Sequence, residues 1–181
     1  LNQTGDFSIL SEKVPYFQDR EIFRGTEKDN EWKEENGTLL VDKYGNIVEG
    51  TVLEHILIEN LTAFYEVGQH NIIRLRGADW NDALDMADEN GESVAFTFAY
   101  AGNLKRLSKL CRYLSEKEGI YTISIPRALT TLLDTGAEKY ESVESKTGIL
   151  KTYLSYVQPY ISDERTDVSI DHLACSLEEK A

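Results

Sequence analysis

Cysteine and histidine are scarce in this sequence, and their scarcity excludes a protein built around disulfides or metal ions. The two cysteines, Cys111 and Cys175, lie far apart in segments with helical spacing, and the three histidines stand singly at positions 55, 70 and 172. Disulfide frameworks and zinc sites need cysteines and histidines at close or regular spacings. We therefore expect two buried, reduced thiols, no metal site and a cytoplasmic location.

Basic residues and long apolar runs are also in short supply. The chain carries 19 lysines and arginines against 32 acids, which gives a formal net charge of −13 at pH 7. A charge of this sign repels phosphate groups, so neither nucleic acid nor an anionic membrane is an expected partner. A membrane-spanning helix needs about 18 consecutive apolar residues. The sequence contains no such run, so we expect no membrane span.

The residues that remain are those of a packed domain. Hydrophobic residues make up 41% of the chain, and ten tyrosines, six phenylalanines and two tryptophans are among them. A chain of 181 residues is long enough for one domain with a core of its own. The chain begins with Leu rather than with Met, followed by polar residues, and residues 173–181 keep a helical pattern without a stop signal. We therefore expect residues 1–181 to form a single partial domain, a fragment of a longer protein.

Apolar spacing and capping residues predict a mainly helical chain. The clearest helix covers residues 51–67, where Thr51 is the expected N-cap, Glu54 occupies the third helical position and Gly68 follows the end. Further helices are expected over residues 92–118, 126–134 and 138–160 and from residue 169 onward. Charged and turn residues dominate 18–50, which we expect to be a long irregular loop or a hairpin. The pattern as a whole predicts an all-α fold.

The most informative segment is Arg-Gly-Ala-Asp-Trp-Asn-Asp-Ala-Leu-Asp at residues 76–85. Three acids, one amide and one large aromatic ring lie within seven positions: Asp79, Trp80, Asn81, Asp82 and Asp85. The apolar face of a sugar stacks on an indole ring, and its hydroxyl groups bond to carboxylates and amides. A carboxylic acid with a raised pKa can then protonate a glycosidic oxygen. The pattern indicates a carbohydrate site, and the competing interpretation is an acidic loop around one buried tryptophan.

Several stretches of the chain resemble one enzyme family. Gly77-Ala78-Asp79-Trp80-Asn81-Asp82, followed by Gly91-Glu92-Ser93, is similar to the signature of glycoside hydrolase family 94, which includes the cellobiose and chitobiose phosphorylases. Thr4-Gly5-Asp6 and Thr51 with Glu54-His55 resemble the family as well. The resemblance implies an (α/α)6 barrel, whose twelve helices of about 15–20 residues need well over about 300 residues. This chain is therefore expected to supply about half of such a barrel.

The resemblance also implies roles for individual residues. Asp82 would be the general acid in the cleavage of a β-linked disaccharide or oligosaccharide, with inversion of the anomeric centre. Inorganic phosphate would be the co-substrate and nucleophile, and no other cofactor is implied. The implied substrate-binding residues are Asp79, Trp80, Asn81, Asp85 and Glu92. Asp85 stands where the family often has Asn, so this departure bears on the acceptor side of the site.

Two other functions stay open at this point. One is an inverting hydrolase with Asp79 or Glu92 as its base, which requires two carboxylates about 6.5–9.5 Å apart. The other is a non-catalytic helical domain that binds carbohydrate or is purely structural. Arg74 and Arg76 either face the acids or an anion, or pair at the surface. The expected partners are a small sugar, phosphate and the remainder of the parent chain, with a second copy of the chain as a further alternative.

Overall fold

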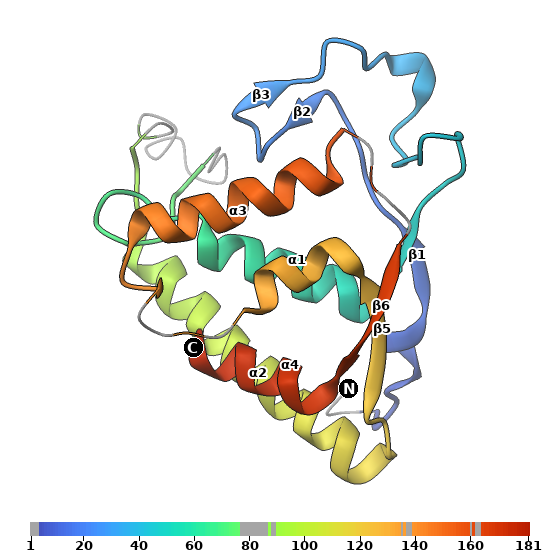
Figure 1. Ribbon diagram of the computed structural model, residues 1–181, viewed down its shortest axis with the longest axis vertical. Coiled ribbons are helices and arrows are strands. Elements are labelled where there is room, and N and C mark those ends of the chain that lie inside the picture. The colour runs from blue at the N-terminus through green and yellow to red at the C-terminus, as the bar shows by residue number, and fades with distance from the viewer. Residues whose placement is uncertain are drawn as a thin grey trace.

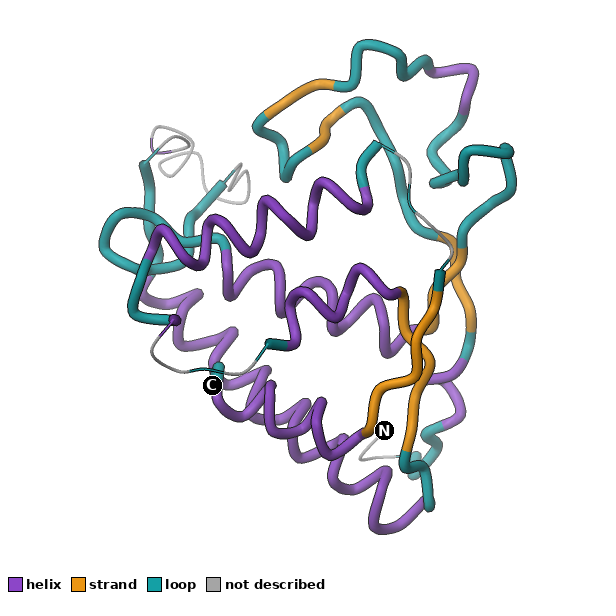
Figure 2. The backbone as a smooth tube through the Cα atoms, viewed as in Figure 1, coloured by secondary structure: helices purple, strands orange, loops and turns teal. Residues whose placement is uncertain are grey.

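The computed structural model describes residues 4–76, 87, 90–134, 136, 139–159, 161 and 164–181. Within them, the α-helices are α1 (Val52–Tyr65), α2 (Val94–Glu118), α3 (Val143–Val157) and α4 (Ile170–Glu179). Shorter 3-10 helices are η1 (Ser8–Ser11), η2 (Glu34–Asn36) and η4 (Arg127–Leu133). Figure 1 shows α1 and η4 between α3 on one side and the crossed pair of α2 and α4 on the other. The strands lie at one edge and beyond α3 (Figure 2).

Each α-helix begins after a hydroxyl residue. The N-cap side chains of Thr51, Ser93, Ser142 and Ser169 each accept a hydrogen bond from the backbone N–H three residues later. Such caps satisfy one of the free donors of a helix start, so a helix begins where they occur. Helix α2 ends at Gly119, whose φ of +68° is left-handed and suits glycine. The helices predicted near 51–67, 92–118 and 138–160 and from 169 onward are confirmed, with somewhat shorter bounds.

Three small antiparallel sheets accompany the helices within the described ranges, so the expectation of an all-α fold holds only in part. Strand β1 (Lys13–Pro15) pairs with β4 (Glu49–Thr51). Strand β2 (Glu21–Ile22) pairs with β3 (Glu27–Lys28), which confirms a hairpin inside the irregular region 18–50. Strand β5 (Thr122–Pro126) pairs with β6 (Arg165–Ser169). About half of the described chain is helical, and the β1–β4 and β5–β6 pairs join segments distant in sequence.

The β5–β6 pair is the largest departure from the sequence prediction. Its register runs from Thr122 opposite Ser169 to Pro126 opposite Arg165. A helix was expected over residues 126–134, but β5 extends to Pro126 and the 3-10 helix η4 follows it. Segments of five residues are too short for their alternating pattern to stand out against neighbouring helical patterns. The pairing is decided by contacts across the fold and not by local spacing.

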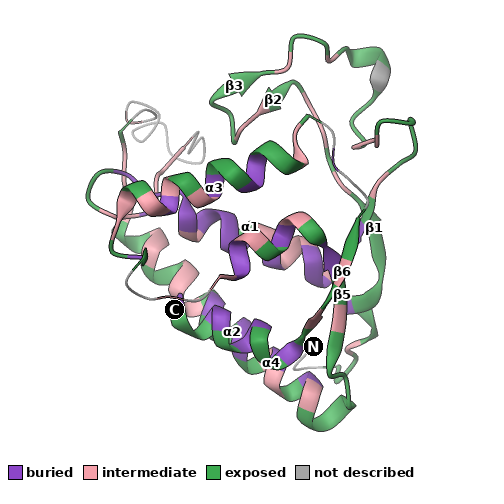
Figure 3. Cartoon of the chain, viewed as in Figure 1, coloured by how far each residue is buried: buried purple, intermediate pink, exposed green. Residues whose placement is uncertain are grey.

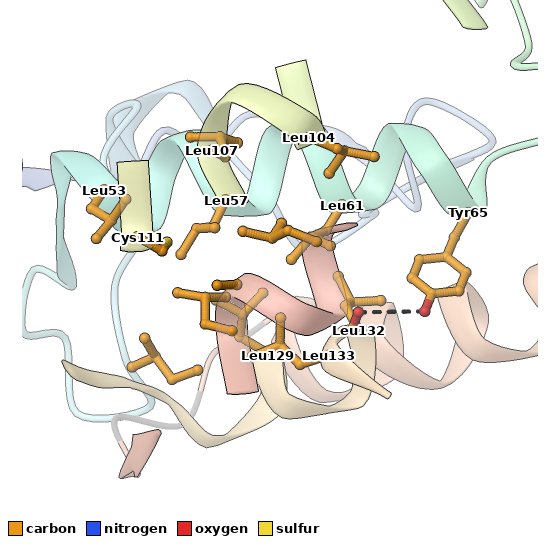
Figure 4. Close-up of a cluster of buried hydrophobic side chains, with 14 of the residues drawn as sticks. Leu53, Leu57, Leu61, Tyr65, Leu104, Leu107, Cys111, Leu129, Leu132 and Leu133 are labelled. Atoms are coloured by element: carbon orange, nitrogen blue, oxygen red, sulfur yellow. Dashed lines mark hydrogen bonds between the residues drawn. The ribbon is translucent and has the colours of Figure 1, made fainter. Parts of the chain in front are cut away.

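Helix α1 lies at the centre of the core. Its Leu57, Leu61 and Tyr65 are fully buried. Figure 4 shows them against Leu104 and Cys111 of α2 and against the buried leucines of η4, Leu129, Leu132 and Leu133. The hydroxyl of Tyr65 donates a hydrogen bond to the carbonyl oxygen of Leu132, 3.4 Å away. Figure 3 shows that the buried side of each helix is turned inward. Burying one such side chain contributes about 1.5–3 kcal/mol to the stability of the fold. Helix α1 is therefore held by apolar contacts with both α2 and η4.

The two cysteines differ in environment. Cys111 is buried as expected, and burial raises the pKa of its thiol to about 12. Cys175 is exposed, so the expectation of two buried thiols is wrong for this residue. Helix α4 buries the stripe formed by Ile170, Leu173 and Leu177, and position 175 falls outside that stripe. Both cysteines are free thiols.

Among the described residues, no group of three or more histidines, cysteines and acids is arranged to hold a metal ion. None of the helices in the described ranges is long and apolar enough to cross a membrane.

Candidate active site

The acidic block itself lies outside the described residues. This applies to Asp79, Trp80, Asn81, Asp82 and Asp85, so their positions and roles remain predictions. The structure describes the residues on either side of the block, through Arg76 before it and from Asn90 after it. These flanking residues show how the chain approaches and leaves the block.

Backbone hydrogen bonds join the two flanking segments. The N–H of Leu75 donates to the carbonyl oxygen of Gly91, 2.9 Å away, and the N–H of Ser93 donates to that of Ile73, 2.8 Å away. Arg74 and Glu92 form an antiparallel bridge between these bonds. The segment that contains the acidic block is therefore closed at its base, between the end of α1 and the start of α2. Catalytic residues are often found on loops that a rigid scaffold holds in this way.

Glu92, the one predicted site residue that the structure describes, binds a histidine. Its side chain is 12% exposed, and its Oε1 accepts a hydrogen bond from the backbone N–H of His70, 2.9 Å away. Its Oε2 lies 2.6 Å from Nδ1 of the same residue. The backbone N–H of His70 is the main cause that lowers the pKa of Glu92. Both carboxylate oxygens thus hold residue 70 against the start of α2, and a contact between Glu92 and a sugar remains a prediction.

Glycine at position 68 makes room for this contact. A Cβ atom there would lie 2.2 Å from Oε1 of Glu92, closer than any real van der Waals contact. The sequence alone treats Gly68 as the stop of a helix. Its tertiary role is to let the Glu92 carboxylate approach the backbone closely.

A second buried carboxylate, Glu66, binds two arginines. Its side chain is 6% exposed, and its Oε1 accepts a hydrogen bond from Nε of Arg76, 2.7 Å away. Its Oε2 accepts one from Nε of Arg24 in the β2–β3 turn. Arg74 donates through its own Nε to the carbonyl oxygen of Val67, 3.1 Å away. Arg76 is thus paired with a buried carboxylate of the fold, whereas the acids of the block lie outside the described residues.

A cavity of about 470 Å³ lies against this ion-pair group. Its walls come from the β2–β3 turn, the end of α1, the segment before the acidic block and one side of α3. The lining residues are Phe23, Arg24, Thr26, Glu27, Tyr65, Glu66, Val67, Arg74, Arg76, Thr147, Leu150, Lys151 and Leu154. Basic residues outnumber acidic ones in this set, although the chain as a whole is strongly acidic. A hollow of this size with an apolar wall and a few charged groups suits a small molecule.

Thr4-Gly5-Asp6, another segment that resembles the family, forms an exposed turn. Asp6 Oδ1 accepts hydrogen bonds from the backbone N–H of Ser8 at 2.9 Å and from its hydroxyl at 2.6 Å. The Ser8 hydroxyl is the main cause that lowers the pKa of Asp6. These contacts explain the segment as local structure.

Glu54 and His55 also have roles within the fold. The Glu54 carboxylate is buried, binds the guanidinium of Arg165 and accepts a hydrogen bond from the hydroxyl of Tyr16, 3.2 Å away. The ring of His55 stacks on that of Tyr16, with 4.2 Å between the centroids. This group lies at the start of α1, at the opposite end from Glu66.

Sequence reasoning missed Glu66 and His70, which bind residues on either side of the acidic block, and Arg165, which binds Glu54 at the other end of α1. Glu66 reaches Arg24 over 42 positions, His70 reaches Glu92 over 22, and Arg165 reaches Glu54 over 111. The spacing of residues along the sequence does not predict contacts over such separations. The sequence did place Glu92 in a segment that resembles the family motif, but it did not identify His70 as the partner of Glu92.

Comparisons with known proteins agree with the resemblance in the acidic block. The family model described as "Glycosyl hydrolase 94 superfamily, catalytic domain" matches residues 26–124, a range that includes the acidic block, Glu66 and Glu92. A solabiose phosphorylase from Paenibacillus borealis is 26% identical over 122 residues. That match covers 66% of this chain and 12% of the relative, so the chain spans only a small part of the relative's length.

Proposed function

Because the chain belongs to the glycosyl hydrolase 94 superfamily, with its match in the catalytic domain, we propose that it is part of a carbohydrate phosphorylase. The parent enzyme cleaves a β-linked disaccharide or oligosaccharide with inorganic phosphate and inverts the anomeric centre. The observation that carries this proposal is a family match over residues 26–124, which contains the complete acidic block. The phosphorylase among the relatives of the chain supports it further.

Asp82 is the general acid in this proposal. Its carboxylic acid donates a proton to the glycosidic oxygen while an oxygen of phosphate attacks the anomeric carbon from the opposite face. The bond from that carbon to the leaving sugar breaks as the bond to phosphate forms, which gives a free sugar and a sugar 1-phosphate. One protein acid is enough because phosphate is itself the nucleophile, whereas an inverting hydrolase needs a second carboxylate to activate water.

The other residues of the block bind and orient the sugars in this proposal. Trp80 offers a stacking surface, while Asp79, Asn81 and Asp85 supply hydrogen-bonding groups. Glu92 is assigned to the same site, just before the start of α2. The hydrogen bonds between residues 73–75 and 91–93 support this assignment, because they hold together the described residues on both sides of the acidic block.

We further propose that the chain forms about half of an (α/α)6 barrel in a cytoplasmic enzyme. Large apolar side chains on the first turns of α2 favour this view, since Val94 is 56% and Phe98 is 76% exposed. Apolar surface of this kind calls for a partner, and the remainder of the catalytic domain is the partner we assign. A site that lacks this cover is not dry or preorganised, so the isolated chain is expected to be inactive.

The test is phosphorolysis of a panel of β-linked disaccharides by the parent enzyme and by this chain, with release of sugar 1-phosphate as the measurement. We expect activity in the parent alone, and a loss of about 10²–10⁴-fold in the Asp82→Asn parent, since that is the usual contribution of a general acid. Asp167→Asn, which changes an exposed acid on β6, is the matched control with unchanged rate.

Three outcomes would contradict the proposal in different ways. An unchanged rate in Asp82→Asn would remove the assignment of the acid. Cleavage in phosphate-free buffer would indicate an inverting hydrolase. Binding of sugars without cleavage by the parent would indicate a non-catalytic domain.

A further inference from the structure

Three residues around the Glu66 carboxylate have an unusual backbone. Phe23 and Arg24 in the β2–β3 turn have φ of +50° and +56°, and Arg76 has φ of +38°. Residues other than glycine rarely adopt such φ values, and these backbone conformations persist only where the surrounding structure enforces them. Strained residues of this kind gather at functional sites. Here they lie in two segments distant in sequence that meet at one side chain.

Glu66 is the residue that both segments share. Its carboxylate binds Nε of Arg24 through one oxygen and Nε of Arg76 through the other. The turn is also held by other hydrogen bonds. Nη1 of Arg24 donates to the hydroxyl of Thr62 on α1, 3.0 Å away, and the N–H of Phe23 donates to Oε1 of Gln158, 2.6 Å away. Of the contacts described for Arg76, its side-chain hydrogen bond to Glu66 connects it to the end of α1.

The position of Glu66 is itself fixed. It is the C-cap residue of α1, and its N–H donates to the carbonyl oxygens of Thr62 and Ala63. Its own carbonyl oxygen accepts a hydrogen bond from the N–H of Arg74, 3.0 Å away. The backbone of Glu66 is thus held at the end of the central helix, and its carboxylate is held by the two arginines, so the contact joins both segments to the core.

The charges make this contact sensitive to a single change. Two guanidinium groups, each about one third exposed, share one carboxylate that is 6% exposed. Without the negative charge, two like charges would face each other at the wall of the 470 Å³ cavity. The turn and the residue before the acidic block would then move apart.

We propose that Glu66 is a positioning residue for the reaction. By binding Arg24 and Arg76 together, it fixes the residue directly before Gly77 and holds the β2–β3 turn beside it. This inference rests on the proposed function, because the acidic block that follows Arg76 carries the general acid. Displacement of a catalytic group by about 1 Å costs on the order of 10²-fold in rate.

The experiment uses the parent enzyme and the Glu66→Gln variant, which keeps the shape of the side chain and removes its charge. We expect kcat for phosphorolysis to fall on the order of 10²-fold with a much smaller change in KM, since the acid is misplaced while the sugar-binding groups remain. Arg76→Gln is expected to lower kcat as well. The double variant should be no slower than the slower single variant, because both changes break the same contact.

Glu54→Gln is the matched control. Glu54 is a buried carboxylate that binds an arginine at the other end of α1, so its loss affects stability without touching the segment before the acidic block. We expect this variant to melt at a lower temperature and to keep its kcat where it is folded. If Glu66→Gln behaves in the same way, with a lower Tm and an unchanged kcat, Glu66 is purely structural and the proposal is wrong.

Amide hydrogen exchange separates this inference from the proposed function. The N–H of Leu75, bonded to Gly91, should exchange faster in Glu66→Gln than in the wild-type parent and in Glu54→Gln. If the wild-type parent shows no phosphorolysis, the proposed function fails, and exchange at Leu75 then decides alone whether Glu66 holds this segment. Unchanged exchange at Leu75 would overturn the proposal whatever the activity.

Discussion

Lys146 places an ammonium group inside the protein, and replacing it with methionine should stabilise the fold. The side chain lies on α3 and is 6% exposed. Its Nζ stands 4.0 Å from the centroid of the Phe64 ring. Burial lowers the pKa of Lys146 from 10.5 to about 8. A second buried lysine, Lys180 at the end of α4, lies 6.0 Å from the same ring centroid.

Two opposing effects set the magnitude. A pKa lowered from 10.5 to about 8 corresponds to about 3 kcal/mol of unfavourable interaction for the charged form. The contact between the ammonium and the Phe64 ring offsets about 1–2 kcal/mol of this. Methionine has a similar length and no charge, so it keeps the packing and avoids the burial cost. Lys146→Met should therefore raise the free energy of unfolding at neutral pH by about 1–2 kcal/mol.

The pH dependence gives the sharper test. The unfolded chain keeps the Lys146 proton up to about pH 10.5, whereas the folded chain loses it near pH 8. The cost is thus fully present below pH 8 and fades as the pH rises from 8 to 10.5, where the unfolded state binds more protons. The advantage of the variant should shrink over the same window. Lys180 titrates in a similar way in both proteins, so its contribution cancels in the difference.

Urea unfolding followed by circular dichroism at neutral and alkaline pH is the assay. Lys151→Met, an exposed change on the same helix, is the control and should alter the free energy of unfolding by less than about 0.5 kcal/mol. A variant Lys146→Met that is less stable than wild type at neutral pH would refute the reasoning. So would a stabilisation that stays constant up to pH 10.5.

Two further experiments test the packing around Glu92 and in the core. Gly68→Ala should displace Glu92 from His70 and lower the free energy of unfolding by about 1–3 kcal/mol, while Gly148→Ala, in α3 with open space around it, should raise it by about 0.5–1 kcal/mol; equal effects in urea titrations would contradict this. In a thiol-reagent assay, Cys175 should react in the folded protein and Cys111 only after unfolding, because Cys111 is buried and its thiol pKa is raised to about 12. Rapid reaction in the folded Cys175→Ser variant would count against the burial of Cys111.

The sequence predicts the helix starts well because their signals are local. Thr51, Ser93 and Ser169 each precede an apolar pattern, and the cap bonds that they make reach only three residues along the chain. Gly119 marks the end of α2 in the same local way. Such features depend on a few neighbouring residues, so a single sequence contains them in full.

The sheets and the ion pairs escape prediction for the opposite reason. Strand β5 meets β6 only after α3 has intervened, and neither strand alternates long enough to be recognised alone. In the sequence, Glu66 is a polar residue at the end of a predicted helix, and its neighbours along the chain do not predict its contact with Arg24. The residue pattern indicated the acidic block and the family resemblance added Glu92, whereas the contacts of Glu66 and His70 on either side of the block emerge only from the folded chain.

The β5–β6 pairing has a consequence for the order in which the chain folds during synthesis. Pro126 leaves the ribosome about 40 residues before its partner Arg165, an interval of about 2–8 s at about 5–20 residues per second. During that interval β5 has an open edge, and the side of α2 where Ser108 later bonds to the carbonyl oxygen of Ala174 has no cover. A nascent chain that ends before Arg165 therefore exposes an unpaired strand and an apolar helix face to chaperones. When β6 and α4 have been synthesised, β6 pairs with β5 and α4 covers the face of α2.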